Sequence, residues 1–251
     1  MKDLAGQTFV LCHGAWHGGW CWRDVANALR ARGAEVYTPT MTSMGERAHL
    51  KAAYKGLITY IDDVCAVIQR EELSSVTLVG HSFGGMAITG VADRLPSAIK
   101  RLVYLDAAVP KDGQSLITQN IANPAEANEA VQKKMEAMAD EWLPIPSLEL
   151  IGVNTASESI KARELSGMTP HPVSSLTDPI TFINGGPHCP CTYIVCDNPP
   201  MPGSSFVVHY EQIKAGAYGD HWTARRIDTG HMAMFTAPEE TVAMLAEAAL
   251  A

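Results

Sequence analysis

The chain has 251 residues, of which 47% are hydrophobic and 18% charged, and a formal net charge of -8. This composition excludes an intrinsically disordered chain and is typical of a globular protein that buries a substantial core. The chain has a negative charge and no basic run, which argues against nucleic acid or an anionic membrane as a partner. It also has no apolar segment near the roughly 18 residues that span a bilayer, which argues against a membrane protein.

In chain order, strand-like and helix-like segments alternate over the first 106 residues. Residues 1–6 lead directly into an apolar strand at 8–12, which is too short for the core of a signal peptide, so we expect a cytoplasmic protein. The other elements expected here are a helix that ends at Gly33, a strand at 35–38, a helix at 58–73, a strand at 76–79 followed by a helix, and a strand at 101–106.

The alternation stops between residues 110 and 190, a region with many prolines and one helical pattern at 125–142. It resumes with an expected strand at 192–196, a helix at 206–215, a strand at 223–227 and a final helix from Pro238. This order predicts an α/β fold with an open, mostly parallel, doubly wound sheet. We expect a single domain over residues 1–251, with a helical cap inserted at about 110–190.

The central motif follows the strand at 76–79. Gly80-His81-Ser82-Phe83-Gly84 fits the G-x-S-x-G nucleophile elbow, in which a strand turns sharply into a helix. The turn strains the backbone of the serine, and side chains two residues to either side would collide, which explains both glycines. We expect Ser82 to be a nucleophile at a helix N-terminus, where the helix dipole favours developing negative charge.

Two further segments supply the other parts of this chemistry. The His13-Gly14-Ala15 segment follows the first strand, where a second backbone N–H can meet that of Phe83 and form an oxyanion hole. The alternative is that this segment is only a tight turn with a structural histidine. His231 follows the last strand, where the chain order serine, carboxylate, histidine predicts the catalytic base.

Six cysteines in a chain of this length, without an export signal, are expected to be reduced thiols. The His-Cys-Pro-Cys run at 188–191 has no second Cys or His pair at the spacing of a zinc finger, and His13 and His17 have no evident carboxylate partner nearby. We therefore expect no metal site.

Together these motifs resemble the α/β-hydrolase superfamily, and most closely the branch that holds plant methylesterases, hydroxynitrile lyases and bacterial esterase relatives. The resemblance rests on residues 13–20, 80–85, 193–196 and 230–234, and it is weakest across the cap. It implies a sheet of about eight strands with a cap over the site. It also implies that Ser82 is the nucleophile, that His231 is the base, and that the N–H groups of Ala15 and Phe83 form the oxyanion hole.

Within that branch the chain is similar to the esterases. Hydroxynitrile lyases carry a threonine in the first loop and a lysine after the histidine, where this chain has Gly14 and Met232. Methionine cannot stabilise a departing cyanide, so a lyase is not expected. The resemblance implies a carboxylesterase-type serine hydrolase that works through an acyl-enzyme and needs no cofactor. An amidase or carbamate hydrolase on the same triad, and a non-catalytic small-molecule binding protein of the same fold, are the alternatives.

The substrate is expected to be a small, uncharged ester with an apolar or aromatic group. Trp16 in the first loop and Met135, Met138 and Trp142 in the cap offer an adaptable apolar wall for it. Packing of the cap on the core would explain each of these side chains equally well. The natural ester and the presence of a homodimer are left open by the sequence.

The acid of the triad has two main candidates. The plant relatives place it a few residues beyond the strand that matches 193–196, where this chain has a proline, whereas Asp197 directly abuts the strand. Asp106 ends the strand after the elbow helix, so it should emerge at the same sheet edge as Ser82, and the bacterial relatives carry a similar Tyr-Leu-Asp-Ala segment. Asp228 is too close in sequence to His231 to reach its far ring nitrogen. We predict Asp106, with Asp197 as the alternative.

Overall fold

A six-stranded sheet forms the centre of the protein, whose computed structural model describes residues 3–119, 133, 137–138 and 141–251. The strand order is β2-β1-β3-β4-β7-β8, and all neighbouring strands are parallel. The strands are β1 (Thr8–Cys12), β2 (Glu35–Tyr37), β3 (Val76–His81), β4 (Ile99–Leu105), β7 (Cys191–Cys196) and β8 (Trp222–Ile227). The predicted open α/β sheet is confirmed, although this sheet has six strands in the described residues and not the eight or so that the resemblance implied.

The inner strands are apolar because they are covered on both faces. Every residue of β3 and of β7 is buried, whereas the edge strand β8 is mostly exposed or half-buried. Strands of parallel sheets that are buried on both sides have continuous rather than alternating apolar sequences. This is why the runs at 76–79 and 192–196 could be recognised as strands without a period-two pattern.

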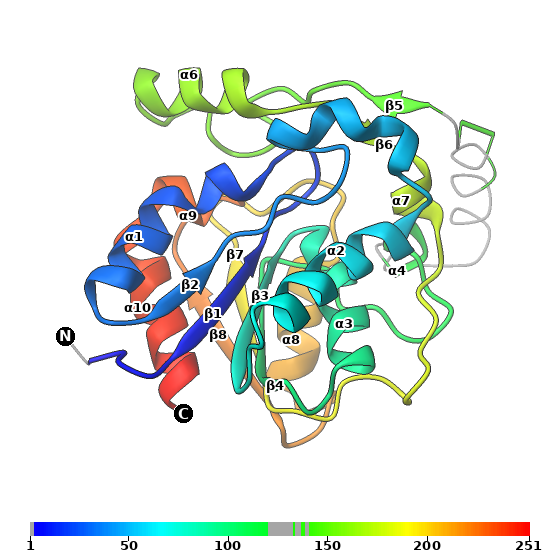
Figure 1. The fold of residues 1–251 in the computed structure, drawn as a ribbon. Coiled ribbons are helices and arrows are strands. Elements are labelled where there is room, and N and C mark those ends of the chain that lie inside the picture. The colour runs from blue at the N-terminus through cyan, green and yellow to red at the C-terminus, as the bar shows by residue number, and fades with distance from the viewer. Residues whose placement is uncertain (1–2, 120–132, 134–136, 139–140) are drawn as a thin grey trace.

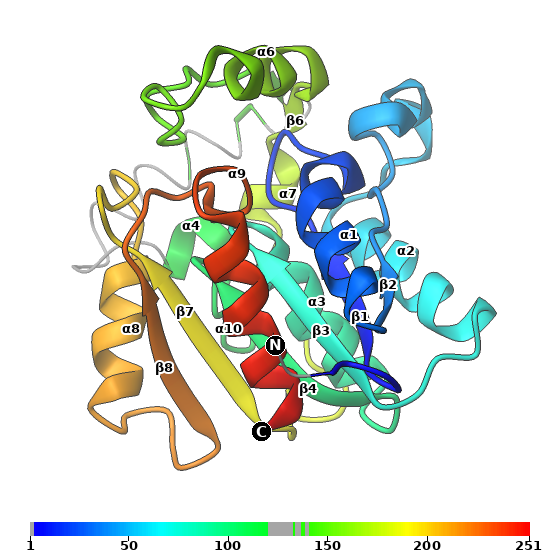
Figure 2. The ribbon, with the colours of Figure 1, turned by 90° about the vertical axis from the view of Figure 1, so that its left-hand side faces the viewer.

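Helices cover the two faces of the sheet (Figures 1 and 2). The helices α1, α9 and α10 pack on one face, with their own hydrophobic core, and α2, α3 and α8 pack on the other. Their bounds are α1 (Arg23–Ala31), α2 (Leu57–Arg70), α3 (Gly84–Arg94), α8 (Phe206–Lys214), α9 (Ala233–Thr236) and α10 (Pro238–Leu250). The expected elements outside the 110–190 region therefore form close to their predicted bounds.

Most of the chain between β4 and β7 lies beyond the carboxyl ends of the strands, and its last part returns past α3 to the start of β7 (Figures 1 and 2). It contains α4 (Leu116–Gln119), β5 (Trp142–Leu143), α6 (Glu158–Gly167), β6 (His171–Pro172) and α7 (Ser174–Thr177). The helix predicted at 125–142 falls mainly outside the described residues, and it is wrong at its end because Trp142 begins β5 and pairs with Pro172 of β6. The prediction of a single domain with a cap insertion stays a prediction.

Two 3₁₀ segments complete the edge of the sheet where the strands end. They are η1 (Gly19–Trp22), after the first loop, and η2 (Gly45–Ala53), after β2.

All six cysteines are free thiols. None of the helices in the described residues combines the length and the apolar character needed to cross a bilayer.

Candidate active site

Ser82 occupies a tight turn between β3 and α3. Its φ angle is +55°, a left-handed conformation that side-chain-bearing residues seldom adopt and that stores strain at functional sites. A Cβ atom on Gly80 would lie 2.8 Å from the carbonyl oxygen of Gly84, and one on Gly84 would lie 2.7 Å from the carbonyl oxygen of His13. Both glycines are thus required by close backbone approach, as expected for the elbow.

Asp106 and His231 form a buried pair beside this turn. His231 Nδ1 lies 2.6 Å from Asp106 Oδ2, and the side chains are 4% and 1% exposed. The other carboxylate oxygen of Asp106 accepts a hydrogen bond from the N–H of Cys196, at 3.1 Å. Burial raises the pKa of Asp106 above its ordinary value, and the hydrogen bond from His231 opposes this rise. Like Ser82, Asp106 has a positive φ, +44°.

The other two candidate carboxylates point elsewhere. Asp197 Oδ1 lies 2.7 Å from Arg226 Nε, in an ion pair at the surface. The side chain of Asp228 is 71% exposed and accepts a hydrogen bond from Asn198. Of the three aspartates considered from the sequence, it is Asp106 that the structure brings to the imidazole.

Two aromatic rings hold the imidazole of His231 in place. The His81 ring lies 4.5 Å away, and the Phe206 ring is stacked on the imidazole at 5.5 Å with an interplanar angle of 12°. His81 Nε2 also donates to the His231 carbonyl, at 2.9 Å. Burial, and then the neighbouring His231, lowers the pKa of His81 well below its ordinary value, so this ring is neutral. His81 occupies a variable position of the elbow motif, so the sequence gave no signal for its role, and Phe206 had none beyond its place at the start of a helix.

Backbone hydrogen bonds tie Ser82 to the residues that flank Asp106. The Ser82 N–H donates to the Leu105 carbonyl at 3.3 Å, and the Ser82 carbonyl accepts from the Ala108 N–H at 3.0 Å. Within the described residues Ser82 Oγ makes no hydrogen bond to His231, and such bonds are often loose until a substrate binds. The three residues thus lie at the carboxyl edge of β3 and β4, which His231 reaches from the loop after β8.

The predicted oxyanion residues lie next to the serine. A Cβ atom on Gly14 would lie 2.9 Å from Ser82 Cβ, so the first loop packs directly against the nucleophile. Ala15 and Phe83 are both buried, and among the described residues neither of their backbone N–H groups donates a hydrogen bond. Unpaired buried N–H groups are rare, and two beside a strained serine are suited to binding an oxyanion.

The predicted substrate-binding residues have different surroundings. Met135 lies outside the described residues, and Met138 is half-buried in a turn. The Trp16 ring lies 5.8 Å from that of His171, whose imidazole in turn meets Phe83 edge-on at 5.0 Å. Trp16 therefore lies close to the candidate oxyanion hole.

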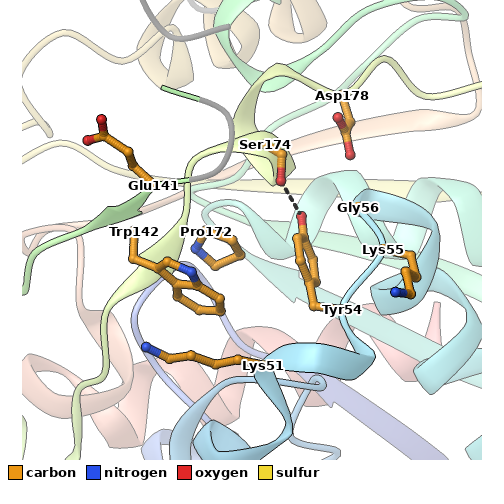
Figure 3. A pocket seen from close by; sticks show the side chains of 9 residues that line it. All are labelled: Lys51, Tyr54, Lys55, Gly56, Glu141, Trp142, Pro172, Ser174 and Asp178. Carbon is orange, nitrogen blue, oxygen red and sulfur yellow. Dashed lines mark hydrogen bonds between the residues drawn. The ribbon is translucent and has the colours of Figure 1, made fainter. Parts of the chain in front are cut away.

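Trp142 lines a pocket of about 330 Å³ (Figure 3). Its ring lies 6.3 Å from the Tyr54 ring and has Lys51 Nζ 4.3 Å from its centroid. The remaining lining residues are Lys55, Gly56, Glu141, Pro172, Ser174 and Asp178. Tyr54 contacts Tyr60, which meets Phe83 edge-on at 5.8 Å, so two aromatic rings separate the pocket from the elbow. With two lysines and two carboxylates, this pocket is more polar than the apolar wall expected from the sequence.

Neither His13 nor His17 has a free ring nitrogen for a metal. His13 Nδ1 contacts the Gly14 carbonyl and its Nε2 accepts from the Met41 N–H, and both nitrogens of His17 are also hydrogen-bonded. Among the residues that the structure describes, no cluster of three or more His, Cys, Asp or Glu side chains is arranged to hold a metal ion.

Several characterised proteins are similar to parts of this chain. A Nocardioides protein described as carbendazim hydrolyzing esterase is 60% identical over 110 residues, 44% of this chain and 46% of that protein. A rice protein described as probable esterase PIR7A is 34% identical over 120 residues, 46% of this chain and 44% of that protein. The chain thus spans about half the length of these relatives.

Solved structures match nearly the whole chain. An extracellular α/β-hydrolase from a Paenibacillus species, described as sharing structural and functional homology with tobacco salicylic acid binding protein 2, superposes with a TM-score of 0.78 at 27% identity. The match covers 96% of this chain and 98% of that one. Polyneuridine aldehyde esterase has the same fold, with a TM-score of 0.72 at 18% identity, over 98% and 99% of the two chains. The model of the alpha/beta hydrolase family matches residues 9–244, and the chain therefore belongs to that family.

Proposed function

We propose that this protein is a carboxylesterase-type serine hydrolase with Ser82, His231 and Asp106 as its triad. The observation that carries the proposal is the 2.6 Å contact between His231 Nδ1 and Asp106 Oδ2 beside a serine held at φ +55°. A buried carboxylate against one imidazole nitrogen leaves the other nitrogen free to act as a base. A binding protein of the same fold would have no need of this strained and costly arrangement.

The reaction starts when Ser82 Oγ attacks the ester carbonyl carbon and His231 Nε2 takes the hydroxyl proton. Asp106 keeps the Nδ1 proton in place and stabilises the imidazolium that forms. The carbonyl oxygen becomes an oxyanion and accepts hydrogen bonds from the N–H groups of Ala15 and Phe83. The imidazolium then protonates the leaving alkoxide, and the alcohol departs from the acyl-enzyme. In the second half, His231 deprotonates water, which attacks the acyl carbon. The bond between that carbon and Ser82 Oγ breaks, the imidazolium returns the proton to Oγ, and the acid leaves.

The substrate that we propose is a small methyl ester or methyl carbamate on an aromatic ring. The relative named for carbendazim, a methyl carbamate on a benzimidazole, supports the carbamate, and the similarity to a rice protein described as a probable esterase supports the ester. The Trp16 ring, which lies 5.8 Å from that of His171 close to the candidate oxyanion hole, offers aromatic surface for one such ring. The expected cytoplasmic location stays a prediction, and one structural neighbour is described as extracellular.

The test is a panel of p-nitrophenyl acetate, aryl methyl esters and aryl methyl carbamates including carbendazim, together with a fluorophosphonate probe. Wild type should turn over members of the panel, and the probe should modify Ser82 in a peptide map. Ser82→Ala should lose both, while Ser204→Ala, at a half-buried serine in a turn, should keep both. Undiminished turnover by Ser82→Ala would refute the mechanism.

A further inference from the structure

Helix α6 buries a single side chain, and that side chain carries a carboxyl group. Of residues 158–167 only Glu164 is buried, with no exposed surface. A buried carboxylate is destabilising unless it is paired and hydrogen-bonded. Its Oε2 lies 2.9 Å from Nε2 of His17, which is equally buried, while its Oε1 has no hydrogen-bond partner among the described residues. Burying this carboxyl group therefore costs folding free energy that an apolar residue at this position would not.

His17 connects this carboxylate to the candidate oxyanion hole. Its Nδ1 lies 2.7 Å from the carbonyl oxygen of Ala15. A carbonyl can only accept, so Nδ1 carries a proton. At Nε2 two proton arrangements satisfy the contact: an imidazolium facing the Glu164 carboxylate, or a neutral ring that accepts the carboxyl proton. In both arrangements Glu164 fixes the second nitrogen and hence the direction of the Nδ1–H bond.

A second buried histidine holds the other side of Ala15. His13 Nδ1 donates to the Gly14 carbonyl at 2.8 Å, and its Nε2 accepts from the Met41 N–H at 3.0 Å. Burial lowers the pKa of His13 to about 4, so the ring is neutral with its proton on Nδ1. The Gly14 carbonyl belongs to the same peptide unit as the Ala15 N–H. The hydrogen bond from His13 to the Gly14 carbonyl therefore fixes the plane of this peptide group and polarises the Ala15 N–H.

The two histidines thus hold the carbonyls before and after the Ala15 N–H, which itself has no partner among the described residues. We infer that Glu164 is a positioning residue for the oxyanion hole and acts through His17 on the peptide groups of Ala15. This inference rests on the proposed hydrolase mechanism. Loss of the contact should let the N–H turn away from the oxyanion, and small misplacements in such a site cost rate rather than substrate affinity.

Docking of α6 alone does not explain the pair, because a neighbouring residue already serves that purpose. Arg163 forms an ion pair with Asp24 of α1 at 2.8 Å, and its guanidinium lies 4.7 Å from the ring centroid of Phe235 in α9. These contacts are partly exposed and attach α6 to the body without touching the first loop. Arg163 therefore offers a matched control on the same helix.

The experiment compares Glu164→Leu, Glu164→Gln and His17→Leu with the control Arg163→Gln. Glu164→Leu and His17→Leu should each lower kcat by about 10- to 100-fold with KM within about twofold, and the double variant should be no worse than either. Glu164→Gln should retain most of kcat, because its amide N–H can donate to Nε2 while Nδ1–H stays on the Ala15 carbonyl. Arg163→Gln should keep the wild-type kcat.

A trifluoromethyl ketone that adds to the serine gives a second readout, since its adduct needs the same N–H groups. The affinity of Glu164→Leu for this ketone should fall by about the same factor as its kcat. A loss of folded protein alone would lower kcat without lowering the affinity of the enzyme that remains folded. Wild-type kcat in Glu164→Leu, or an equal loss in Arg163→Gln, would overturn the inference. If Glu164→Leu does not fold, Glu164→Asp decides in the same way, because it withdraws the carboxyl group by one methylene. If wild type hydrolyses no ester or carbamate at all, it is the proposed function that has failed.

Discussion

Replacing Asp106 with asparagine should remove most of the activity without unfolding the protein. The two carboxylate oxygens have different donors: Oδ1 accepts from the Cys196 N–H at 3.1 Å, and Oδ2 faces His231 Nδ1 at 2.6 Å. An amide keeps one acceptor and replaces the other by an NH₂ donor. Because the Cys196 N–H is a fixed backbone donor, the amide oxygen should turn to it and the NH₂ should face the imidazole.

This orientation forces the wrong tautomer on His231. Nδ1 must then accept, the ring proton moves to Nε2, and Nε2 can no longer take the proton of Ser82. The reversed amide places two donors face to face at Cys196, which costs about 1–3 kcal/mol. The productive form is then populated about 5- to 150-fold less, which sets the smallest expected loss in kcat. If the His231 ring is entirely in the wrong tautomer, the loss in kcat reaches its largest expected value, about 10⁴-fold.

Steady-state hydrolysis of p-nitrophenyl acetate measures this loss, with thermal unfolding as the check on the fold. The matched control is Asp197→Asn, which removes only the carboxylate that pairs with Arg226 at the surface. It should remain within about twofold of wild type. A crippled Asp197→Asn beside an Asp106→Asn with near wild-type kcat would refute the assignment.

Three further outcomes are expected. Gly14→Ala places a Cβ 2.9 Å from that of Ser82, so kcat should fall at least about tenfold, and an unchanged kcat would contradict the close approach. Trp16→Ala removes the ring beside His171 and should raise KM for aryl methyl esters by about 3- to 10-fold but not for methyl acetate, and an equal effect on both would exclude a ring-binding role. Burial lowers the pKa of His13 to about 4 and that of His171 to about 3, against about 6.5 in the unfolded chain. The unfolded chain then binds more protons below pH 6.5, so each histidine should lower the free energy of unfolding by about 2 kcal/mol between pH 7 and pH 5. Urea titrations with equal midpoints at both pH values would contradict this.

The sequence predicted the elements whose signal is local. A buried strand, a turn with two obligatory glycines and a helix with apolar residues at helical spacing are each determined by neighbours within a few residues, and residues 76–94 contain all three in succession. Parallel topology then places the strand ends at one edge, which brings both Asp106 and Asp197 to it. The prediction of Asp106 rested on its strand lying next to that of Ser82 and on the resemblance to the bacterial relatives.

Contacts between distant segments had no such signal. Trp142 lies at the end of a helical pattern, yet it pairs with Pro172, 30 positions away, in a two-residue strand. Phe206 begins a predicted helix, and nothing in its spacing shows that its ring stacks on His231. Lys51 enters the pocket beside Trp142 from η2, a segment that has no buried residues of its own, and Lys55 enters it from the loop that follows η2. In each case tertiary packing rather than local preference decides the surroundings.

Glu164 is the residue whose surroundings are hardest to predict from the sequence. Its contact also bears on which parts of the chain outside the triad influence kcat. A glutamate on a short polar helix has the sequence pattern of a solvated side chain, and its partner His17 is 147 residues earlier. The first loop follows β1, but two of its carbonyls are held from elsewhere: that of Ala15 through the His17–Glu164 pair and that of Trp16 by the N–H of Thr169 at 2.9 Å. Docking of the chain between β4 and β7 therefore shapes the loop that carries the proposed oxyanion donor Ala15. Substitutions in α6 that displace the carboxyl group of Glu164 should lower kcat although they touch neither substrate nor triad, whereas those that leave it in place, such as Arg163→Gln, should not.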